Sequence, residues 1–106
     1  MLTNKEIDEL VARIVARMRP ERVIVFGSYA KGTAHPRSDL DLCIITDTEL
    51  PPGRRADALG PLLGTCLVPV DVHVHTPEEV RVYGAEMYSF LRSVLETGRT
   101  VYEARL

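Results

Sequence analysis

Cysteine is scarce in this sequence, long apolar runs are missing, and basic residues do not outnumber acidic ones. The two cysteines, Cys43 and Cys66, lie in apolar segments without metal-binding spacing, so we expect reduced, buried thiols in a cytoplasmic protein. No stretch approaches the roughly 18 apolar residues of a membrane helix, and the first residues lack the apolar core of a signal peptide. The net charge of −2 argues against an extended nucleic-acid surface.

The length and composition indicate one globular domain. The chain has 106 residues, of which 45% are hydrophobic and 26% are charged, as in ordinary globular proteins. No internal repeat, low-complexity tract or linker divides it. We therefore predict a single domain over residues 1–106.

Hydrophobic periodicity predicts helices alternating with short strands. Apolar residues recur at helical spacing over residues 3–18, where Thr3 or Asn4 can serve as N-cap and Pro20 ends the helix. We predict strands over residues 22–26, 40–45, 67–75 and 99–103. We predict further helical segments over residues 28–31, over 54–63 with an interruption at Gly60-Pro61, from Pro77 after a Thr76 N-cap, and over 85–97. This order predicts an α/β fold with a small mixed sheet and helices packed mainly on one face.

A pair of alternating aspartates opens the strand predicted over residues 40–45. Asp39 and Asp41 are two positions apart, so in an extended segment their side chains point to one face. Two carboxylates at such a short distance repel each other unless they share a proton or a cation. Hard oxygen ligands of this kind suit Mg²⁺, which usually combines one or two carboxylates with waters and substrate phosphates. The pair therefore indicates a magnesium site.

A third aspartate, Asp71, interrupts the strand predicted over residues 67–75. Alternating valines occupy one face of that strand, and Asp71, His73 and His75 occupy the other. If the valines pack under helices, Asp71 faces the open side of the sheet. A helical crossover would make this strand a neighbour of 40–45 and bring three carboxylates to one patch. The two histidines could join a metal site or contact a base, but alternating polar residues on an open face explain them as well.

A Gly-Ser pair follows the first predicted strand. Gly27 and Ser28 form a tight turn at the start of a short helical segment, and backbone N–H groups in such a turn bind phosphate oxygens. Ser28 also suits a simple helix N-cap, which is compatible with phosphate binding. The candidate cationic contacts to phosphate or to a partner are Arg37, Arg54, Arg55 and, beside the turn itself, Lys31.

In combination, these residues resemble the motif of the nucleotidyltransferase superfamily that includes DNA polymerase beta. The motif is a Gly-Ser pair, ten residues, Asp-x-Asp and a later third acid, and residues 27–41 together with Asp71 fill every position. The resemblance is closest to the small stand-alone members, the minimal nucleotidyltransferases, and extends over most of the chain. One departure is Lys31, where the family often carries Arg, so the charge is kept but the planar fork for phosphate is lost.

The resemblance implies the polymerase-beta-like fold and a Mg²⁺-dependent reaction. A nucleoside monophosphate, AMP from ATP, would pass to an acceptor hydroxyl with release of pyrophosphate. Gly27, Ser28 and Lys31 would bind the nucleotide. Two Mg²⁺ ions would be held by Asp39, Asp41 and Asp71, and Asp71 would also help to deprotonate the acceptor.

The resemblance also implies a partner. Small members of this superfamily pair with HEPN-domain proteins in toxin–antitoxin modules, and some adenylylate a tyrosine of the partner. We therefore expect a HEPN-type partner for this chain. Two alternatives stay open: nucleotidyl transfer to a small molecule or an RNA end, and an antitoxin that acts by contact alone.

Overall fold

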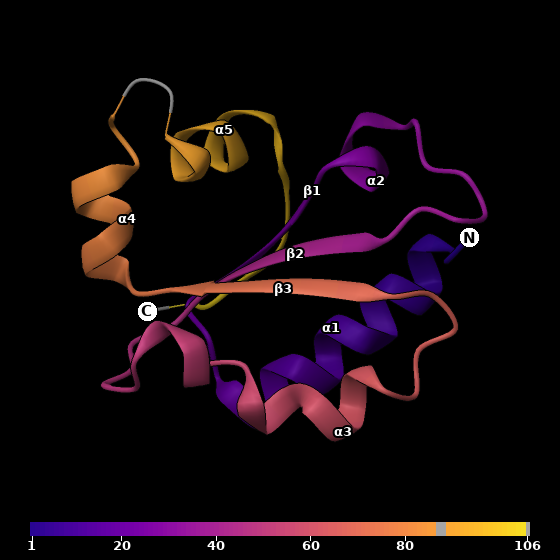
Figure 1. Ribbon diagram of the computed structural model, residues 1–106, viewed down its shortest axis with the longest axis horizontal. Coiled ribbons are helices and arrows are strands. Elements are labelled where there is room, and N and C mark those ends of the chain that lie inside the picture. The colour runs from indigo at the N-terminus through magenta and orange to yellow at the C-terminus, as the bar shows by residue number, and fades with distance from the viewer. Residues whose placement is uncertain (87–88, 106) are drawn as a thin grey trace.

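The computed structural model describes residues 1–86 and 89–105, which form a mixed four-stranded sheet with helices on both faces (Figure 1). The strands are β1 (Arg22–Phe26), β2 (Leu40–Ile45), β3 (Val70–His75) and β4 (Arg99–Glu103). Their order is β3-β2-β1-β4. β1 runs antiparallel to β2 and β4, whereas β2 and β3 are parallel. The predicted mixed α/β sheet is confirmed.

The helices are short apart from the first. They are α1 (Asn4–Met18), α2 (Ser28–Lys31), α3 (Gly60–Leu63), α4 (Pro77–Tyr83) and α5 (Phe90–Thr97), with 3₁₀ turns η1 (Pro52–Arg54) and η2 (Asp57–Leu59) before α3. Within the described residues, none of these helices is long and apolar enough to cross a membrane.

Two helices begin at capping boxes. The Thr3 hydroxyl accepts a hydrogen bond from the Glu6 amide at 3.1 Å, and Glu6 accepts one from the Thr3 amide at 2.9 Å. Thr76 and Glu79 repeat this pattern at the start of α4. Each box satisfies two amides that have no partner inside the helix. The N-caps predicted at Thr3 and Thr76 are confirmed.

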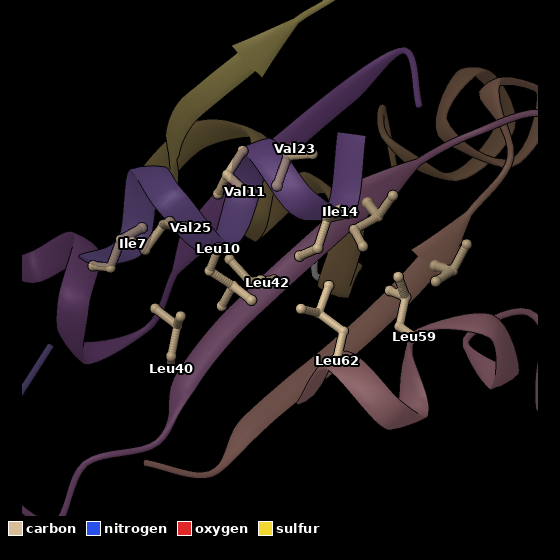
Figure 2. Close-up of a cluster of buried hydrophobic side chains, with 12 residues drawn as sticks. Ile7, Leu10, Val11, Ile14, Val23, Val25, Leu40, Leu42, Leu59 and Leu62 are labelled. Carbon is tan, nitrogen blue, oxygen red and sulfur yellow. The ribbon is translucent and has the colours of Figure 1, made fainter. Parts of the chain in front are cut away.

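The larger hydrophobic core lies between α1, α3 and one face of the sheet (Figure 2). Side chains of α1 point toward those of β1 and β2, and η2 and α3 close the cluster beside β3. Its buried members are Ile7, Leu10, Val11, Ile14, Val23, Val25, Leu40, Leu42, Ile44, Leu59, Leu62 and Val74. Each fully buried aliphatic side chain contributes about 1.5–3 kcal/mol, so this cluster is the main source of stability.

A smaller core lies on the opposite face, under α5. Leu91 and Val94 of α5 pack with Ile24, Cys43 and Ile45 of the sheet. The sequence pattern predicted an open face on this side. In the structure α5 covers part of this face, whereas the side chain of Asp71 is 59% exposed.

Two helix predictions needed correction. The helix predicted over residues 54–63 is α-helical only at Gly60–Leu63, after the 3₁₀ turn at Asp57–Leu59. The break predicted at Gly60-Pro61 is wrong, because Pro61 lies in the first turn of α3, where its missing amide costs no hydrogen bond. The helix predicted over residues 85–97 begins only at Phe90, because the Ser89 hydroxyl caps it by accepting from the Arg92 amide. Part of that predicted segment, Met87 and Tyr88, lies outside the described residues.

The third strand is also shorter than predicted. It begins at Val70 rather than at residue 67, directly after Pro69. Proline cannot donate a ladder hydrogen bond, although the Pro69 carbonyl accepts one from the Leu40 amide at 2.9 Å. The ladder with β2 therefore starts one residue before Asp71, which fixes where that carboxylate lies.

Candidate active site

Two of the predicted carboxylates face each other across neighbouring strands. In the parallel ladder of β2 and β3, Asp41 pairs with Asp71. Side chains at paired positions of adjacent strands lie on the same face of the sheet, here the face of the smaller core. The crossover from β2 through α3 to β3 produces this register. The sheet therefore brings together two acids that are far apart in the sequence.

The third carboxylate, Asp39, lies just before β2 and is exposed. Burial raises the pKa of the Asp41 carboxyl, and the negative charges of Asp71 and Asp39 raise it further. This concentration of like charge at Asp41 is the electrostatic condition that a cation would relieve.

The donor set suits Mg²⁺ held jointly with a substrate. Among the described residues, no three His, Cys, Asp or Glu side chains are grouped closely enough to enclose a metal ion by themselves. Mg²⁺ does not need such a cage, because it retains waters and commonly binds through one or two carboxylates plus substrate phosphates. Asp41 and Asp71, with Asp39 nearby, offer carboxylate oxygens of that kind.

The predicted turn at Gly27 lies directly against Asp41. Gly27 follows β1 with a φ of +70°, a backbone conformation that residues other than glycine rarely adopt. A Cβ placed on Gly27 would lie 2.3 Å from Oδ2 of Asp41. The Gly27 backbone and the Asp41 carboxylate therefore share a space that only glycine leaves open.

The Gly27 turn leads into the single turn of α2. No side chain caps the start of this described helix, and the amides of its first residues, Ser28 and Tyr29, have no preceding helical turn to bond. Lys31 ends the helix and is exposed. Of the predicted phosphate-binding residues, Gly27 thus lies against Asp41, and Ser28 and Lys31 follow it in the same helical turn.

The two histidines of β3 point to the same face but toward different partners. His73 Nε2 lies 3.3 Å from Asp71 Oδ2. His75 Nδ1 lies 3.8 Å from Glu79 of α4, and burial lowers the pKa of His75. The alternative of a His-x-His metal site is not supported within the described part of the chain.

Two of the predicted cationic contacts have structural partners instead. Arg55 donates to Glu79, to the Val74 carbonyl and to the Leu50 carbonyl, and its side chain is only 9% exposed. Arg54 pairs with Asp57. These contacts hold the loop after β2 against α4, so Arg55 is a structural residue. Lys31 and Arg37 remain exposed.

Sequence reasoning missed the turn that precedes Asp39. The Ser38 hydroxyl accepts from the His35 amide at 2.9 Å, and the Ser38 amide donates to the His35 carbonyl at 2.9 Å. His35 Nδ1 also accepts from the Arg37 amide. Ser38 is only 9% exposed, so this closed turn fixes the entry of the chain into Asp39 and β2. Pro36 indicated a loop, but nothing in the sequence indicated its hydrogen bonds.

Sequence reasoning also missed a group of aromatic rings beside the carboxylates. Phe90, the first residue of α5, lies 5.3 Å from Phe26 and 4.9 Å from His73 between ring centroids. Phe26 pairs with Asp41 in the antiparallel ladder, and His73 contacts Asp71. We call these three rings the aromatic wall; Phe26 adjoins Asp41, His73 adjoins Asp71, and Phe90 contacts both of these rings.

The chain that carries this glycine turn and these paired carboxylates matches a known family. The family model described as "Nucleotidyltransferase domain" matches residues 7–101. The chain belongs to this family. As a nucleotidyltransferase it is an enzyme, and the resemblance noted in the sequence is confirmed.

A full-length relative supports the assignment. The protein named "Putative protein adenylyltransferase MJ0604" of Methanocaldococcus jannaschii is 30% identical over 106 residues, covering 96% of this nucleotidyltransferase and 100% of the relative. The match leaves no large part of either chain unaligned.

Solved structures confirm the nucleotidyltransferase fold. A toxin-antitoxin crystal structure with AMP-PNP has a TM-score of 0.63 at 19% identity and covers 92% of this chain and 74% of that chain. A mutant of the toxin-antitoxin MntA-HpeT has a TM-score of 0.63 at 20% identity and covers 99% of this chain and 76% of that chain.

Proposed function

We propose that this nucleotidyltransferase transfers AMP from ATP to a tyrosine hydroxyl of a HEPN-type toxin and thereby acts as its antitoxin. The observation that carries the proposal is the pairing of Asp41 with Asp71 beside the Gly27 turn. The adenylyltransferase name of the full-length relative and the toxin-antitoxin structures of similar fold support the reaction and the partner. We treat residues 1–106 as one catalytic domain. Cys43 and Cys66 are free thiols, which supports a cytoplasmic setting; Cys43 is buried as predicted, whereas Cys66 is only partly buried.

The Gly27 turn would hold the leaving part of ATP. The backbone amides that follow Gly27 would bind the β- and γ-phosphate oxygens together with the Ser28 hydroxyl. Lys31 would add a positive charge at the end of the same helical turn. The close contact of Gly27 with Asp41 would bring the α-phosphate next to the carboxylates.

The three aspartates would hold two Mg²⁺ ions together with the triphosphate. When bound, the ions would neutralise the charge on the attacked phosphoryl group and on the leaving pyrophosphate. Asp39 and Asp41 would be ligands of the two ions, and Asp71 would be a ligand of the ion nearest the acceptor. The ions would relieve the like charge that Asp71 and Asp39 impose on Asp41.

Asp71 would also act on the acceptor. The acceptor oxygen forms a bond to the α-phosphorus, the bond from that phosphorus to the bridging oxygen of the β-phosphate breaks, and pyrophosphate leaves. The hydroxyl proton passes to the Asp71 carboxylate, whose side chain is accessible at 59% exposure. His73 Nε2 lies 3.3 Å from Asp71 Oδ2 and can orient this carboxylate.

Intact-protein mass spectrometry tests the proposal. The chain is incubated with ATP, Mg²⁺ and the HEPN-type protein encoded next to its gene, and the neighbour is then weighed. We expect added AMP on the neighbour with the wild type and none with the double variant Asp39→Ala/Asp41→Ala. Asp47→Ala removes an exposed carboxylate at the other end of β2 and should keep full transfer.

The other outcomes separate the alternatives. If the neighbour is bound and silenced but carries no AMP, the chain is an antitoxin that acts by contact alone. A neighbour that is neither bound nor modified would shift the acceptor to a small molecule or an RNA end.

A further inference from the structure

The aromatic wall lies on the same face of the sheet as the pair Asp41 and Asp71. On one face of the sheet, Phe26, Asp41 and Asp71 occupy paired positions on β1, β2 and β3, and His73 lies two residues further along β3. Phe90 reaches over from α5 and contacts both Phe26 and His73 through ring edges or tilted rings. Phe90 nevertheless stays 43% exposed. A large apolar ring this close to an active site is available to a ligand.

The order of the strands separates the two sides of the site. The Gly27 turn lies at the β1 side of Asp41, whereas Asp71 and His73 lie on β3, which is an edge strand. Attacking and leaving oxygens must lie roughly in line on opposite sides of the reacting phosphorus. If the leaving pyrophosphate is bound at the Gly27 turn, the acceptor therefore approaches over β3, where it meets Asp71, His73 and Phe90.

We propose that Phe90 and His73 form the subsite for the acceptor's ring, so that the enzyme prefers a phenolic hydroxyl to an aliphatic one. This inference rests on the proposed function and specifies its acceptor. Aromatic rings pair favourably edge to face or offset, at centroid separations of about 4.5–7 Å. A tyrosine ring placed against Phe90 can present its hydroxyl to Asp71, while a serine side chain is too short to reach the wall and the carboxylate together.

The chemical step is the one already described, with the phenol as nucleophile. The phenolic oxygen bonds to the α-phosphorus, pyrophosphate departs with the electron pair of the broken bond, and the phenolic proton passes to Asp71. Phe90 takes no part in bond making. It is a specificity-determining residue that orients the ring.

A binding experiment tests the subsite without requiring catalysis. N-acetyltyrosinamide is titrated into the isotope-labelled protein with Mg²⁺ and AMP-PNP, and the ring signals of Phe90 and His73 are followed by NMR. We expect these signals to shift with N-acetyltyrosinamide and to stay unchanged with N-acetylserinamide or N-acetylleucinamide. Unchanged ring signals with the tyrosine probe would overturn the proposal. A Phe90 shift produced already by AMP-PNP, and not by the probe, would assign the wall to the nucleobase and overturn it too.

Kinetics with the tyrosine-bearing partner give the second test. Phe90→Ala should lower kcat/KM for the acceptor about three- to tenfold, the effect of losing one aromatic pair, through a higher acceptor KM and with the KM for ATP unchanged. Phe90→Leu keeps apolar bulk and should show the same loss, which separates ring recognition from folding. Leu50 is an apolar residue in the loop after β2 and is also exposed, at 51%, so Leu50→Ala should match the wild type.

The two proposals fail in different ways. Wild-type transfer that is indifferent to Phe90→Ala and Phe90→Leu would overturn the subsite and leave the proposed function standing. A wild type that modifies no partner, although the tyrosine probe shifts the wall signals, would contradict the proposed function while supporting the subsite.

Discussion

Gly27 and Asp41 touch across the first two strands, with room between them for a hydrogen but not for a methyl group. An added Cβ at Gly27 would meet Asp41 Oδ2 at 2.3 Å. Phe26, the residue before Gly27, pairs with Asp41 in the β1–β2 ladder, so neither partner can move far without breaking the sheet. The phosphate-binding turn and the central carboxylate are therefore one rigid unit.

The first prediction concerns Gly27→Ala. The new methyl group should displace the Asp41 carboxylate and lower the transfer rate roughly a hundredfold, as expected for a misplacement of about 1 Å at a reacting centre. Gly32→Ala is the control for a positive φ (+73°) without crowding, because an added Cβ there has nothing within 4 Å. Its ψ of 18° is left-handed helical, a less strained region than the ψ of −148° at Gly27. Gly32→Ala should cost about 1–2 kcal/mol of stability and leave the transfer rate intact. Equal rate losses in the two variants would show that backbone strain alone matters.

The second prediction separates catalysis from folding at Asp41. Asp41→Asn should reduce transfer roughly a hundredfold or more while the fold persists. Burial and the charges of Asp71 and Asp39 raise the pKa of Asp41, so the ionised carboxylate destabilises the metal-free protein. The variant should therefore have a higher Tm than the wild type without metal at neutral pH. This increase in Tm should vanish at acid pH, where the wild-type Asp41 carboxyl is protonated and no longer repels its neighbours. A large drop in Tm would instead indicate a structural hydrogen-bonding role.

The third prediction concerns metal dependence. Since ATP would bring four negative charges to a cluster of aspartates, calorimetry should show much tighter ATP binding with Mg²⁺ than with EDTA. The difference should shrink in Asp41→Asn, which carries less negative charge at the site. Equal affinities with Mg²⁺ and with EDTA in the wild type would contradict the two-metal proposal.

The fourth prediction concerns stability away from the site. The Thr76 amide holds the pKa of Glu79 below its ordinary value, and the Arg55 guanidinium lowers it further. Glu79→Gln should cost about 1–2 kcal/mol at neutral pH, measured by urea unfolding. A lowered folded-state pKa gives stability that is complete above the unfolded value of about 4.5 and is lost as the pH falls through the folded pKa, so the cost should disappear in acid.

A neighbouring residue provides the control for that measurement. Glu78 lies in the same helical turn but pairs with Arg81 on the surface, where both side chains are about 70% exposed. Glu78→Gln should change stability by less than about 0.5 kcal/mol. Similar losses of stability in both variants would show that the Arg55–Glu79 contact contributes no more than the exposed Glu78–Arg81 pair.

The sequence by itself determined the parts of this protein that depend on local chemistry. The helix starts at Thr3 and Thr76, the strand at residues 40–45 and the glycine turn at Gly27 all follow from caps, alternation and backbone freedom over a few residues. The order of the glycine pair and the acids was enough to indicate the family. These features involve neighbours in the chain, so their physical causes are visible in the sequence.

Only the tertiary structure decided how distant segments meet. The crossover sets the register that pairs Asp41 with Asp71, and the packing of α5 places Phe90 against His73. The same long-range packing buried Arg55 beside Glu79, where the sequence had suggested a contact to phosphate or to a partner. Each of these contacts joins residues separated by at least 17 positions (Phe90 and His73). The sequence predicted that Asp71 would lie near Asp39 and Asp41, but not the register that pairs it with Asp41. That register and the other two contacts depend on how whole elements pack, and no periodicity within one segment carries that information.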